Sequence, residues 1–579
     1  MRIWDLRRGD DDDNRVSPHG RGLRSLVFSA LLELNYLKAP IGFLVLILAP
    51  AFLVGVAPSL LVTYGRLVLH TSAQREGRPI LAVLLVLLLV GIALWVGRPL
   101  ARTISKSIWN LHYTLVFPML VALREVLRTL ADRLRGREAL PEELDRGRRV
   151  GAVIAALLVG GAGFALALGV GATHGFAIVD VERARPGTTF TAALGNAAVI
   201  FGLTTIAESA FWIQRELSRR GPVRDWAPRW QDDASAIVRV AHLSDLHIVG
   251  ERYGYRMEPG TRGPRGNGRL RNAFVKLTAI DAATPLDRIV LTGDVTDAGT
   301  RAEWAALLDL LDAFPALRQR VSFVPGNHDV NIIDRQNPGR LDLPWSAGQW
   351  LRKLRVVLAL EAIQGDRAHV IDHDTGAIGP SLKRYLRERD RAAALRDLAR
   401  RGTMLGRWEM AKVWDAVFPL VELPRPGDRY GVILLDSNAS SHFALTNAIG
   451  VVSPGQLRAL DRVLRNNPEH AFLILLHHQV VEHPMPSISL RERVGLSLIN
   501  ASDLMAVVTP HAARVLVLHG HRHRDWIGAS DDVVFCSAPS TSLGSDAQSG
   551  YRGTFHIHHL ALDDGGGVRL SATERVRVP

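Results

Sequence analysis

The sequence predicts a helical membrane region followed by a layered α/β domain. Hydrophobic residues make up 47% of the 579 residues, and many of them lie in long apolar segments before residue 213. From Ala236 the pattern changes, and short apolar strands alternate with helical segments. This alternation is typical of layered α/β domains. A chain of this length is also expected to contain more than one domain.

Four apolar segments are each near the ~20 residues that a bilayer-spanning helix needs. They are residues 40–62, 79–97, 150–172 and 190–207. A fifth segment, Trp109–Leu123, is shorter and contains Asn110 and His112. We therefore expect four spans and an interfacial or buried fifth segment.

The distribution of Lys and Arg predicts the orientation of these spans. The residues before the first span contain seven Lys and Arg, the second loop contains eleven, and the segment after the last span contains four. The first and third loops contain three and two. Because cytoplasmic loops are richer in Lys and Arg, both termini are expected in the cytoplasm of a multi-pass cell-membrane protein. If the fifth segment also spans, the N-terminus moves outside but the C-terminal half stays cytoplasmic.

The expected domain boundaries follow from these patterns. Residues 1–38 are expected to be a disordered tail, residues 39–213 the membrane region, and residues 214–235 a linker. Residues 236–579 form the α/β domain, with a helix-rich, basic insertion at residues 330–428.

The composition bears on partners and compartment. The net charge of +13 lies largely beside the apolar segments, so it indicates topology signals and a lipid bilayer rather than a nucleic-acid partner. The single cysteine, Cys536, excludes an intrachain disulfide and suits a reducing compartment.

The strands and helices of the second domain are predicted from short apolar runs and cap residues. Expected strands are residues 237–243, 288–292, 321–324, 430–435, 472–476 and 515–518. Expected helices include residues 272–282, 302–313 and 453–464. In the last helix, Ser453 is expected to cap, Pro454 to occupy the first turn and Gln456 to complete a capping box.

Polar side chains follow five of these strands. Ligands in open α/β sheets bind beyond the carboxyl ends of the strands, so these side chains are expected to converge. In chain order, the stretches are Asp245-x-His247, Gly293-Asp294-x-x-Asp297, Gly326-Asn327-His328-Asp329, His477-His478 and Gly520-His521-x-His523.

The donors in these stretches are sufficient for two cation sites. One would consist of Asp245, His247, Asp294 and His523, and the other of Asp294, Asn327, His477 and His521. Nitrogen and oxygen donors suit two divalent ions of Mn, Fe, Zn, Co or Ni. Two such ions side by side favour in-line displacement at phosphorus and hence an anionic phosphate ester as substrate. Any one stretch alone is equally typical of a helix cap or a structural histidine, but five in order predict a metal centre.

The ordered set of motifs resembles the calcineurin-like metallophosphoesterase superfamily, most closely the branch with bacterial class III cyclic-nucleotide phosphodiesterases. The resemblance covers about residues 236–562. It implies a four-layer α/β/β/α sandwich in which His328 assists the leaving group or the transition state and Asp329 orients His328. Gln479 replaces a proline that is frequent in the family, which leaves His477 or His478 as the ligand; His477 is preferred. Asp297 is expected to fix its turn rather than to bind metal.

The expected function is therefore metal-dependent hydrolysis of phosphodiester or phosphomonoester bonds, with cyclic nucleotides as one candidate substrate. The membrane region favours a lipid-linked phosphoester or pyrophosphate instead. A third hypothesis is a membrane sensor or scaffold that uses the domain as a regulated module. Histidines 556, 558 and 559 are expected to be exposed on a late strand rather than to bind metal, and His483 is a further candidate for substrate contact.

Overall fold

The computed structural model separates the chain into two compact units. One consists of Leu34–Arg137 and Arg146–Ser218, and the other contains Glu138–Asp145 and Arg219–Pro579. The structure describes residues 38–73, 87, 91, 100–101, 103–136, 139–180, 184–218, 221–227, 236–250, 267–333, 340–343, 346–424, 430–442, 444–483, 498–542, 553–563 and 565–578.

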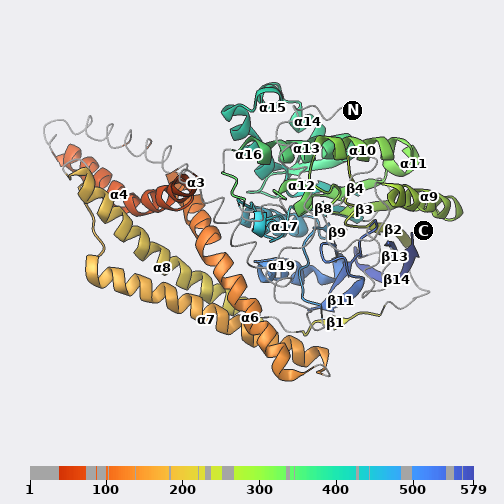
Figure 1. The fold of residues 1–579 in the computed structure, drawn as a ribbon, viewed down its shortest axis with the longest axis horizontal. Coiled ribbons are helices and arrows are strands. Elements are labelled where there is room, and N and C mark those ends of the chain that lie inside the picture. Colours follow the sequence, from red (N-terminus) through yellow and green to blue (C-terminus); the bar gives the residue numbers. More distant parts are fainter. Residues whose placement is uncertain are drawn as a thin grey trace. The chain divides into compact units, whose positions relative to one another are not determined.

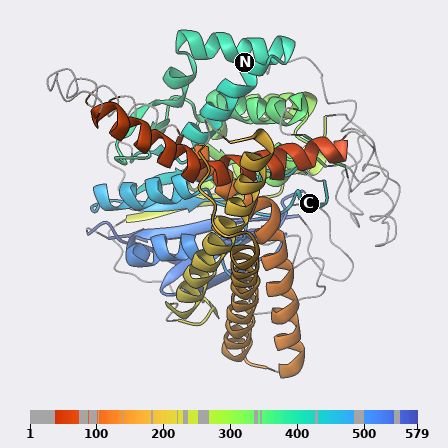
Figure 2. The same ribbon diagram turned by 90° about the vertical axis from the view of Figure 1, so that its left-hand side faces the viewer.

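The first unit consists of long helices (Figures 1 and 2). Its elements are α3 (Lys38–Phe43), η1 (Leu44–Leu48), α4 (Ala49–Ala73), η2 (His112–Val116), α6 (Phe117–Arg135), α7 (Pro141–His174) and α8 (Pro186–Ser218). Three helical segments are long and apolar enough to cross a membrane: Pro40–Leu67, Glu142–His174 and Pro186–Ser218. They contain three of the four expected spans. The fourth, residues 79–97, lies outside the described residues except for two positions. The expected N-terminal tail, residues 1–38, lies outside them except for Lys38.

Small residues allow close helix packing in this unit. A Cβ at Gly55 of α4 would collide with the Ala193 backbone of α8, and Gly163 of α7 lies similarly close to Gly202 of α8. The Trp109–Leu123 segment continues through η2 into α6 and is not among the three candidate spans. Its buried His112 has Nε2 3.2 Å from Oγ1 of Thr205 on α8.

The second unit contains two mixed β-sheets. The nine-stranded sheet has the order β1 (Arg224–Asp225), β11 (Trp526–Ser530), β12 (Val533–Ser537), β10 (Val515–His519), β9 (Ala471–Leu475), β8 (Tyr430–Leu434), β7 (Leu420–Glu422), β5 (Ala368–Ile371) and β6 (Ile378–Ser381). The five-stranded sheet has the order β14 (Val568–Arg577), β13 (Thr554–Leu562), β2 (Ala236–Leu243), β3 (Arg288–Thr292) and β4 (Val321–Val324). Strands β2, β3 and β4 run parallel to one another, as do β8, β9, β10 and β12.

The sheets pack face to face with helices outside them (Figure 1). The helices are α9 (Gly268–Ala283), α10 (Arg301–Asp312), α11 (Pro315–Arg318), α12 (Asn327–Val330), α13 (Ala347–Gln364), α14 (Leu382–Leu386), α15 (Arg389–Arg401), α16 (Met404–Val417), η3 (Ala444–Thr446), α17 (Pro454–Asn466), α19 (Ala501–Val508) and η4 (Thr509–Arg514). One core joins both sheets to α9 and α10, and a second joins the outer face of the nine-stranded sheet to α17 and α19. The predicted four-layer sandwich is thereby confirmed.

Two segments differ from the sequence prediction. The 330–428 region contains strands β5, β6 and β7 besides its helices, and these strands extend the nine-stranded sheet. Strands of three or four residues are too short to show a period of two, which explains why the sequence predicted helices here but not these strands. The expected linker at residues 214–235 contains the end of α8 and strand β1, which pairs with β11.

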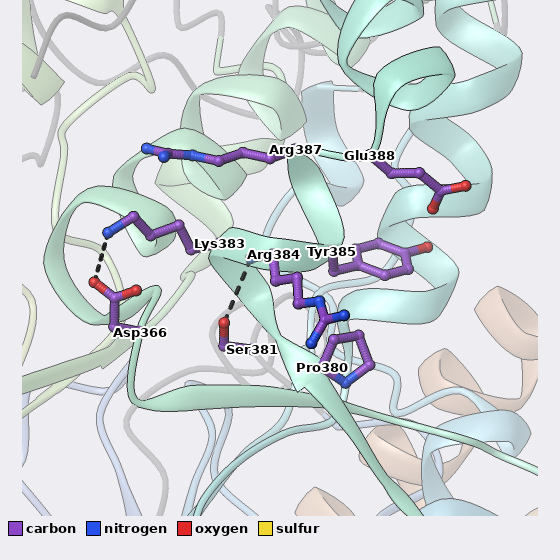
Figure 3. A pocket seen from close by; sticks show the side chains of 8 residues that line it. All are labelled: Asp366, Pro380, Ser381, Lys383, Arg384, Tyr385, Arg387 and Glu388. Atoms are coloured by element: carbon purple, nitrogen blue, oxygen red, sulfur yellow. Dashed lines mark hydrogen bonds and ion pairs between the residues drawn. The ribbon is translucent and has the colours of Figure 1, made fainter.

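The same region has a pocket of about 620 Å³ beside β6 and α14 (Figure 3). Its lining is largely charged and consists of Asp366, Pro380, Ser381, Lys383, Arg384, Tyr385, Arg387 and Glu388. None of these residues belongs to the predicted metal ligands.

Candidate metal centre

The turns after β2 and β3 are held side by side by backbone hydrogen bonds. The amide of Asp245 donates to the carbonyl of Gly293 at 3.1 Å, and the amide of His247 donates to that of Asp294 at 2.9 Å. Parallel pairing brings the ends of β2, β3 and β4 to the same edge. The first three predicted stretches therefore start from neighbouring positions.

The first group of ligand atoms belongs to Asp245, His247 and His523. These atoms all lie within 4.8 Å of one another. Nε2 of His523 is 3.1 Å from Oδ1 of Asp245. Nδ1 of His247 is 3.1 Å from Oδ1 of Asp297, which leaves Nε2 of His247 to face the centre.

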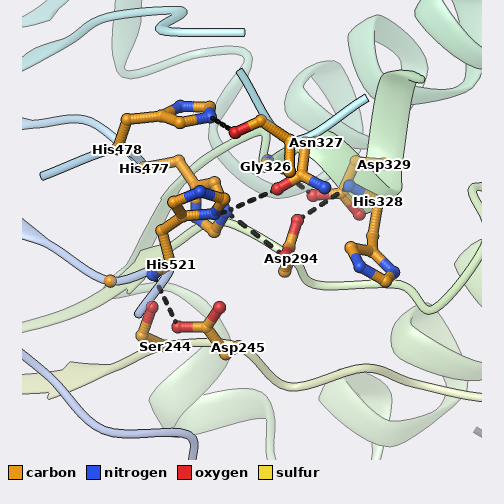
Figure 4. A network of polar contacts seen from close by, with 12 residues as sticks. Ser244, Asp245, Asp294, Gly326, Asn327, His328, Asp329, His477, His478 and His521 are labelled. Carbon is orange, nitrogen blue, oxygen red and sulfur yellow. Dashed lines mark hydrogen bonds and ion pairs between the residues drawn. The ribbon is translucent and has the colours of Figure 1, made fainter. Parts of the chain in front are cut away.

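The second group belongs to Asp294, His477 and His521 (Figure 4). Nε2 of His477 lies 3.2 Å from Oδ2 of Asp294 and 3.0 Å from Nδ1 of His521. Oδ1 of Asn327 is 3.2 Å from the same Nε2 atom. The amide of His521 also donates to Oδ2 of Asp245 at 3.1 Å, which joins the two groups. All seven predicted ligands thus meet in one place.

The two adjacent histidines after β9 have different surroundings. Nδ1 of His477 contacts the carbonyl of Thr292 at 2.8 Å, so its Nε2 faces the second group. Both ring nitrogens of His478 are engaged elsewhere, with Oγ of Ser437 at 2.9 Å and the carbonyl of Ala448 at 3.2 Å. The geometry therefore favours His477 over His478 as the ligand.

His328 and Asp329 are anchored by different partners. Nδ1 of His328 contacts the carbonyl of Asp297 at 2.7 Å. The Asp329 carboxylate accepts hydrogen bonds from the hydroxyl of Thr296 at 2.6 Å and from the Thr296, Val295 and Gly326 amides. Asp329 thus holds together the turns after β3 and β4, and it positions His328 through the backbone of the turn.

Several predicted ligands adopt the left-handed backbone region. Their φ angles lie between 45° and 73°, at Asp245, His247, Asp294, His521 and His523. Such conformations cost of order 1–3 kcal/mol in non-glycine residues and concentrate at functional sites. The surrounding hydrogen bonds hold this strain, which the sequence pattern did not reveal.

The buried carboxylates and histidines of the centre shift one another's pKa values. Burial alone would raise the pKa of Asp294, but the charges of His477 and His328 and the contact with His477 lower it well below its usual value. Burial would lower the pKa of His477, but Asp294 and Asp245 raise it to about 9. The pKa of His521 is lowered well below its usual value by burial and by His478 and His477.

These features fit divalent cations. A site that draws a proton onto His477 attracts positive charge, and a bound cation would displace that proton. Nε2 of His521 is buried and makes no hydrogen bond within the part of the chain that the structure describes. Nitrogen and carboxylate donors of this kind are typical of Zn, Mn and Fe sites.

Two residues that support the centre, Ser437 and Ser540, are not among the predicted site residues. Ser437 follows β8, and its Oγ accepts from the amides of His477 and His478 at 3.2 and 3.1 Å. The polar triplet Asp436-Ser437-Asn438 follows a strand, as the other stretches do, so the same rule points to it. Ser540 donates to the carbonyl of Asp245 at 2.6 Å, and it has no such signal.

The fold and the site together define a metal-dependent phosphoester hydrolase. Residues 238–525 match the family model described as Calcineurin-like phosphoesterase. These residues therefore form a calcineurin-like phosphoesterase domain, as the motifs predicted.

The comparisons with individual proteins describe more limited similarity. A Coxiella burnetii protein named as a probable cyclic nucleotide phosphodiesterase is 32% identical over 102 residues, which is 17% of this chain and 36% of the relative. The chain thus spans about a third of that relative's length. A dimetal phosphatase from Danio rerio matches with 14% identity and a TM-score of 0.33, over 59% of this chain and 99% of that one. The NAD nucleotidase of Haemophilus influenzae matches with 11% identity and a TM-score of 0.30, over 59% and 50%.

Proposed function

We propose that the chain is a membrane-anchored phosphodiesterase with two divalent cations. The observation that carries this proposal is the convergence of seven nitrogen and oxygen donors at the ends of strands from both sheets. One cation would bind Asp245, His247, Asp294 and His523, and the other Asp294, Asn327, His477 and His521. Such a pair of cations supplies positive charge for the phosphoryl oxygens and lowers the pKa of an attacking water.

The protein's own residues would position the substrate and transfer a proton. His328 contacts the Asp297 carbonyl through Nδ1, so the tautomer that donates there presents Nε2 to the substrate side. In its imidazolium form, His328 can pass the Nε2 proton to the departing oxygen. Asp329 fixes the position of this ring relative to Asp294, because its hydrogen bonds join the turns after β3 and β4.

A cyclic nucleotide is the leading substrate candidate. The Coxiella burnetii relative bears that name, and the distribution of Lys and Arg favours a cytoplasmic domain, where cyclic nucleotides occur. The three apolar helices favour a second candidate, a lipid-linked phosphoester or pyrophosphate.

A substrate panel on the detergent-solubilised full chain with Mn²⁺ tests the proposal. It includes bis(p-nitrophenyl) phosphate, cyclic nucleotides and nucleoside-diphosphate lipids. Hydrolysis of the generic diester and a cyclic nucleotide is expected, and hydrolysis of the lipid alone would move the assignment to the second candidate. His328→Ala should lower turnover roughly 10²–10⁴-fold with metals still bound. Full turnover by that variant would exclude the proton-transfer role, and no hydrolysis with any metal would favour a sensor or scaffold.

The orientation is tested by reporter fusions at the C-terminus. A green fluorescent protein fusion is expected to fluoresce, and a periplasm-dependent alkaline phosphatase fusion is expected to be inactive. The opposite pair of results would place the domain outside the cytoplasm.

A further inference from the structure

A second histidine group lies outside the phosphoesterase centre, on paired strands of the five-stranded sheet. His242 of β2 and His556 of β13 are direct partners in the antiparallel pair, and His558 lies two residues further along β13. All three therefore project from the same face of the sheet. Their side chains are fully buried, and three of their ring nitrogens lie within 4.8 Å of one another. The expectation that His556 and His558 are exposed is therefore wrong.

Two of these rings are fixed by threonine hydroxyls on their outer nitrogens. Nε2 of His242 is 3.0 Å from Oγ1 of Thr292, and Nδ1 of His558 is 2.9 Å from Oγ1 of Thr573. A hydrogen bond at the ring nitrogen that does not bind metal sets the tautomer and the orientation of a metal-binding imidazole. The inner nitrogens, Nδ1 of His242 and Nε2 of His558, are 3.2 Å apart. Two imidazole ligands of one tetrahedral zinc, each at ~2.0–2.1 Å, are separated by about 3.3 Å.

The third ring, His556, differs from the other two within the described part of the chain. Neither ring nitrogen of His556 makes a hydrogen bond to any residue in the described ranges, although the side chain is fully buried. Its Nε2 has an ion-pair contact with Asp525 at 3.3 Å, and its buried Nδ1 makes no hydrogen bond among these residues, so the ring has a nitrogen lone pair that a cation can use. A cation bound by one nitrogen of His556 would give that atom a partner. It would also explain why three imidazoles lie together in the protein interior.

An oxygen donor approaches from the other sheet. Asp525 directly precedes β11, and its Oδ1 lies 3.3 Å from Nε2 of His556. Arg575 occupies its other oxygen, Oδ2, at 2.5 Å. The buried Oδ1 makes no hydrogen bond among the residues that are described.

We propose that His242, His556 and His558, with Asp525 as the oxygen donor, form a separate structural cation site of the zinc type. Three nitrogens and one carboxylate oxygen match tetrahedral Zn²⁺. Because Asp525 lies beside His556, a cation bound here would tie β2 and β13 to the β11 side of the other sheet. This inference does not depend on the proposed phosphodiesterase activity.

Zinc stoichiometry of the full chain tests the site. The double variant His556→Gln/His558→Gln is expected to contain one zinc fewer per chain than the wild type after purification with Zn²⁺. His559→Gln is the matched control, because His559 is on the same strand but contacts Glu574 on the neighbouring strand. The control should keep the wild-type stoichiometry. Equal zinc content in all three proteins would overturn the proposal.

A second measurement covers the case in which the double variant does not fold. Asp245→Ala/Asp294→Ala removes carboxylates from the phosphoesterase centre and leaves the histidine group intact. This protein is expected to bind one Co²⁺ with the strong visible absorption of tetrahedral coordination, and Zn²⁺ should raise its Tm. Absence of both effects in the folded protein would exclude the site, whereas loss of hydrolysis alone would concern only the phosphoesterase centre.

Discussion

Gly293 lies against the imidazole ring of His477. A Cβ atom at residue 293 would be 2.4 Å from Nδ1 of His477, and the φ angle of Gly293 is +93°. Alanine at this position would therefore be strained and would displace the His477 ring from the second ligand group. The absence of a side chain at Gly293 therefore allows the backbone to approach the His477 ring closely.

Gly293→Ala is expected to lower metal affinity by roughly 10–100-fold, as displacement of a ligand ring usually does. Activity should fall in parallel and recover partly at high Mn²⁺. Gly348→Ala is the control, because a Cβ there would meet only the Ser346 hydroxyl, at 3.8 Å. Wild-type metal affinity in Gly293→Ala would show that the His477 ring can move without loss of binding.

Asp297 contacts His247, a member of the first ligand group, at the ring nitrogen that faces away from the cation site. Its Oδ1 lies 3.1 Å from Nδ1 of His247. Asp297→Ala frees that ring and is expected to raise the Mn²⁺ concentration for half-maximal activity about 10–100-fold. The measurement is a Mn²⁺ titration of turnover after chelator treatment. Asp309→Ala, on the exposed side of α10, should leave the curve unchanged; an unchanged curve for Asp297→Ala as well would remove Asp297 from this role.

Arg288 and Glu422 form a buried ion pair between the two sheets. Arg288 begins β3, Glu422 ends β7, and both side chains are 1% exposed. Ser322 of β4 also donates to Glu422, at 2.7 Å. Glu422→Ala leaves a buried guanidinium without this partner and is expected to lower the free energy of unfolding by about 3–5 kcal/mol. Denaturant unfolding of the full chain, followed by tryptophan fluorescence, measures the change.

The apolar double variant Arg288→Met/Glu422→Leu provides the comparison for this pair. Replacing both charges removes the uncompensated ion, so the double variant should be more stable than Glu422→Ala alone. A double variant that is less stable would mean that the pair itself, rather than the unpaired charge, dominates the energy.

The parts of the fold that the sequence predicted well are those with local signals. Strands β3 and β4 begin and end at the predicted residues, because each is an apolar run closed by a turn. Ser453 caps α17 as expected, by accepting from the Gln456 amide. The Gln456 side chain, however, contacts the backbone of Asp436 through both its oxygen and its nitrogen. A partner in the segment after β8 can thus replace the local contact of a capping box.

The parts that the sequence could not predict depend on partners distant in the chain. His556 and His558 alternate on β13 as solvent-facing residues would, but their face is covered by the other sheet and is shared with His242. The left-handed conformations of Asp245 and Asp294 likewise follow from hydrogen bonds between turns. The order of ligand types along the chain was sufficient to find the metal centre, whereas strand pairing was needed to find the second histidine group.

Glu303 gives the fold a pH dependence that can be measured without metals. Its buried carboxyl group caps α10 by accepting from the amides of Thr300 and Ala298. Burial, and then the charge of Asp297, raise its pKa from 4.5 to about 8. Between pH 4.5 and about 8, Glu303 keeps its proton in the folded chain but releases it in the unfolded chain. The stabilisation that is fully present below pH 4.5 is therefore lost as the pH rises through about 8. At about 1.4 kcal/mol per pKa unit, the free energy of unfolding of the wild type should decrease by several kcal/mol over this pH range. Glu303→Gln should not show this decrease. Denaturant unfolding of the chelator-treated chain across this pH range, with Asp309→Asn as control, measures the difference; parallel curves for Glu303→Gln and wild type would show that the carboxyl is already ionised when buried.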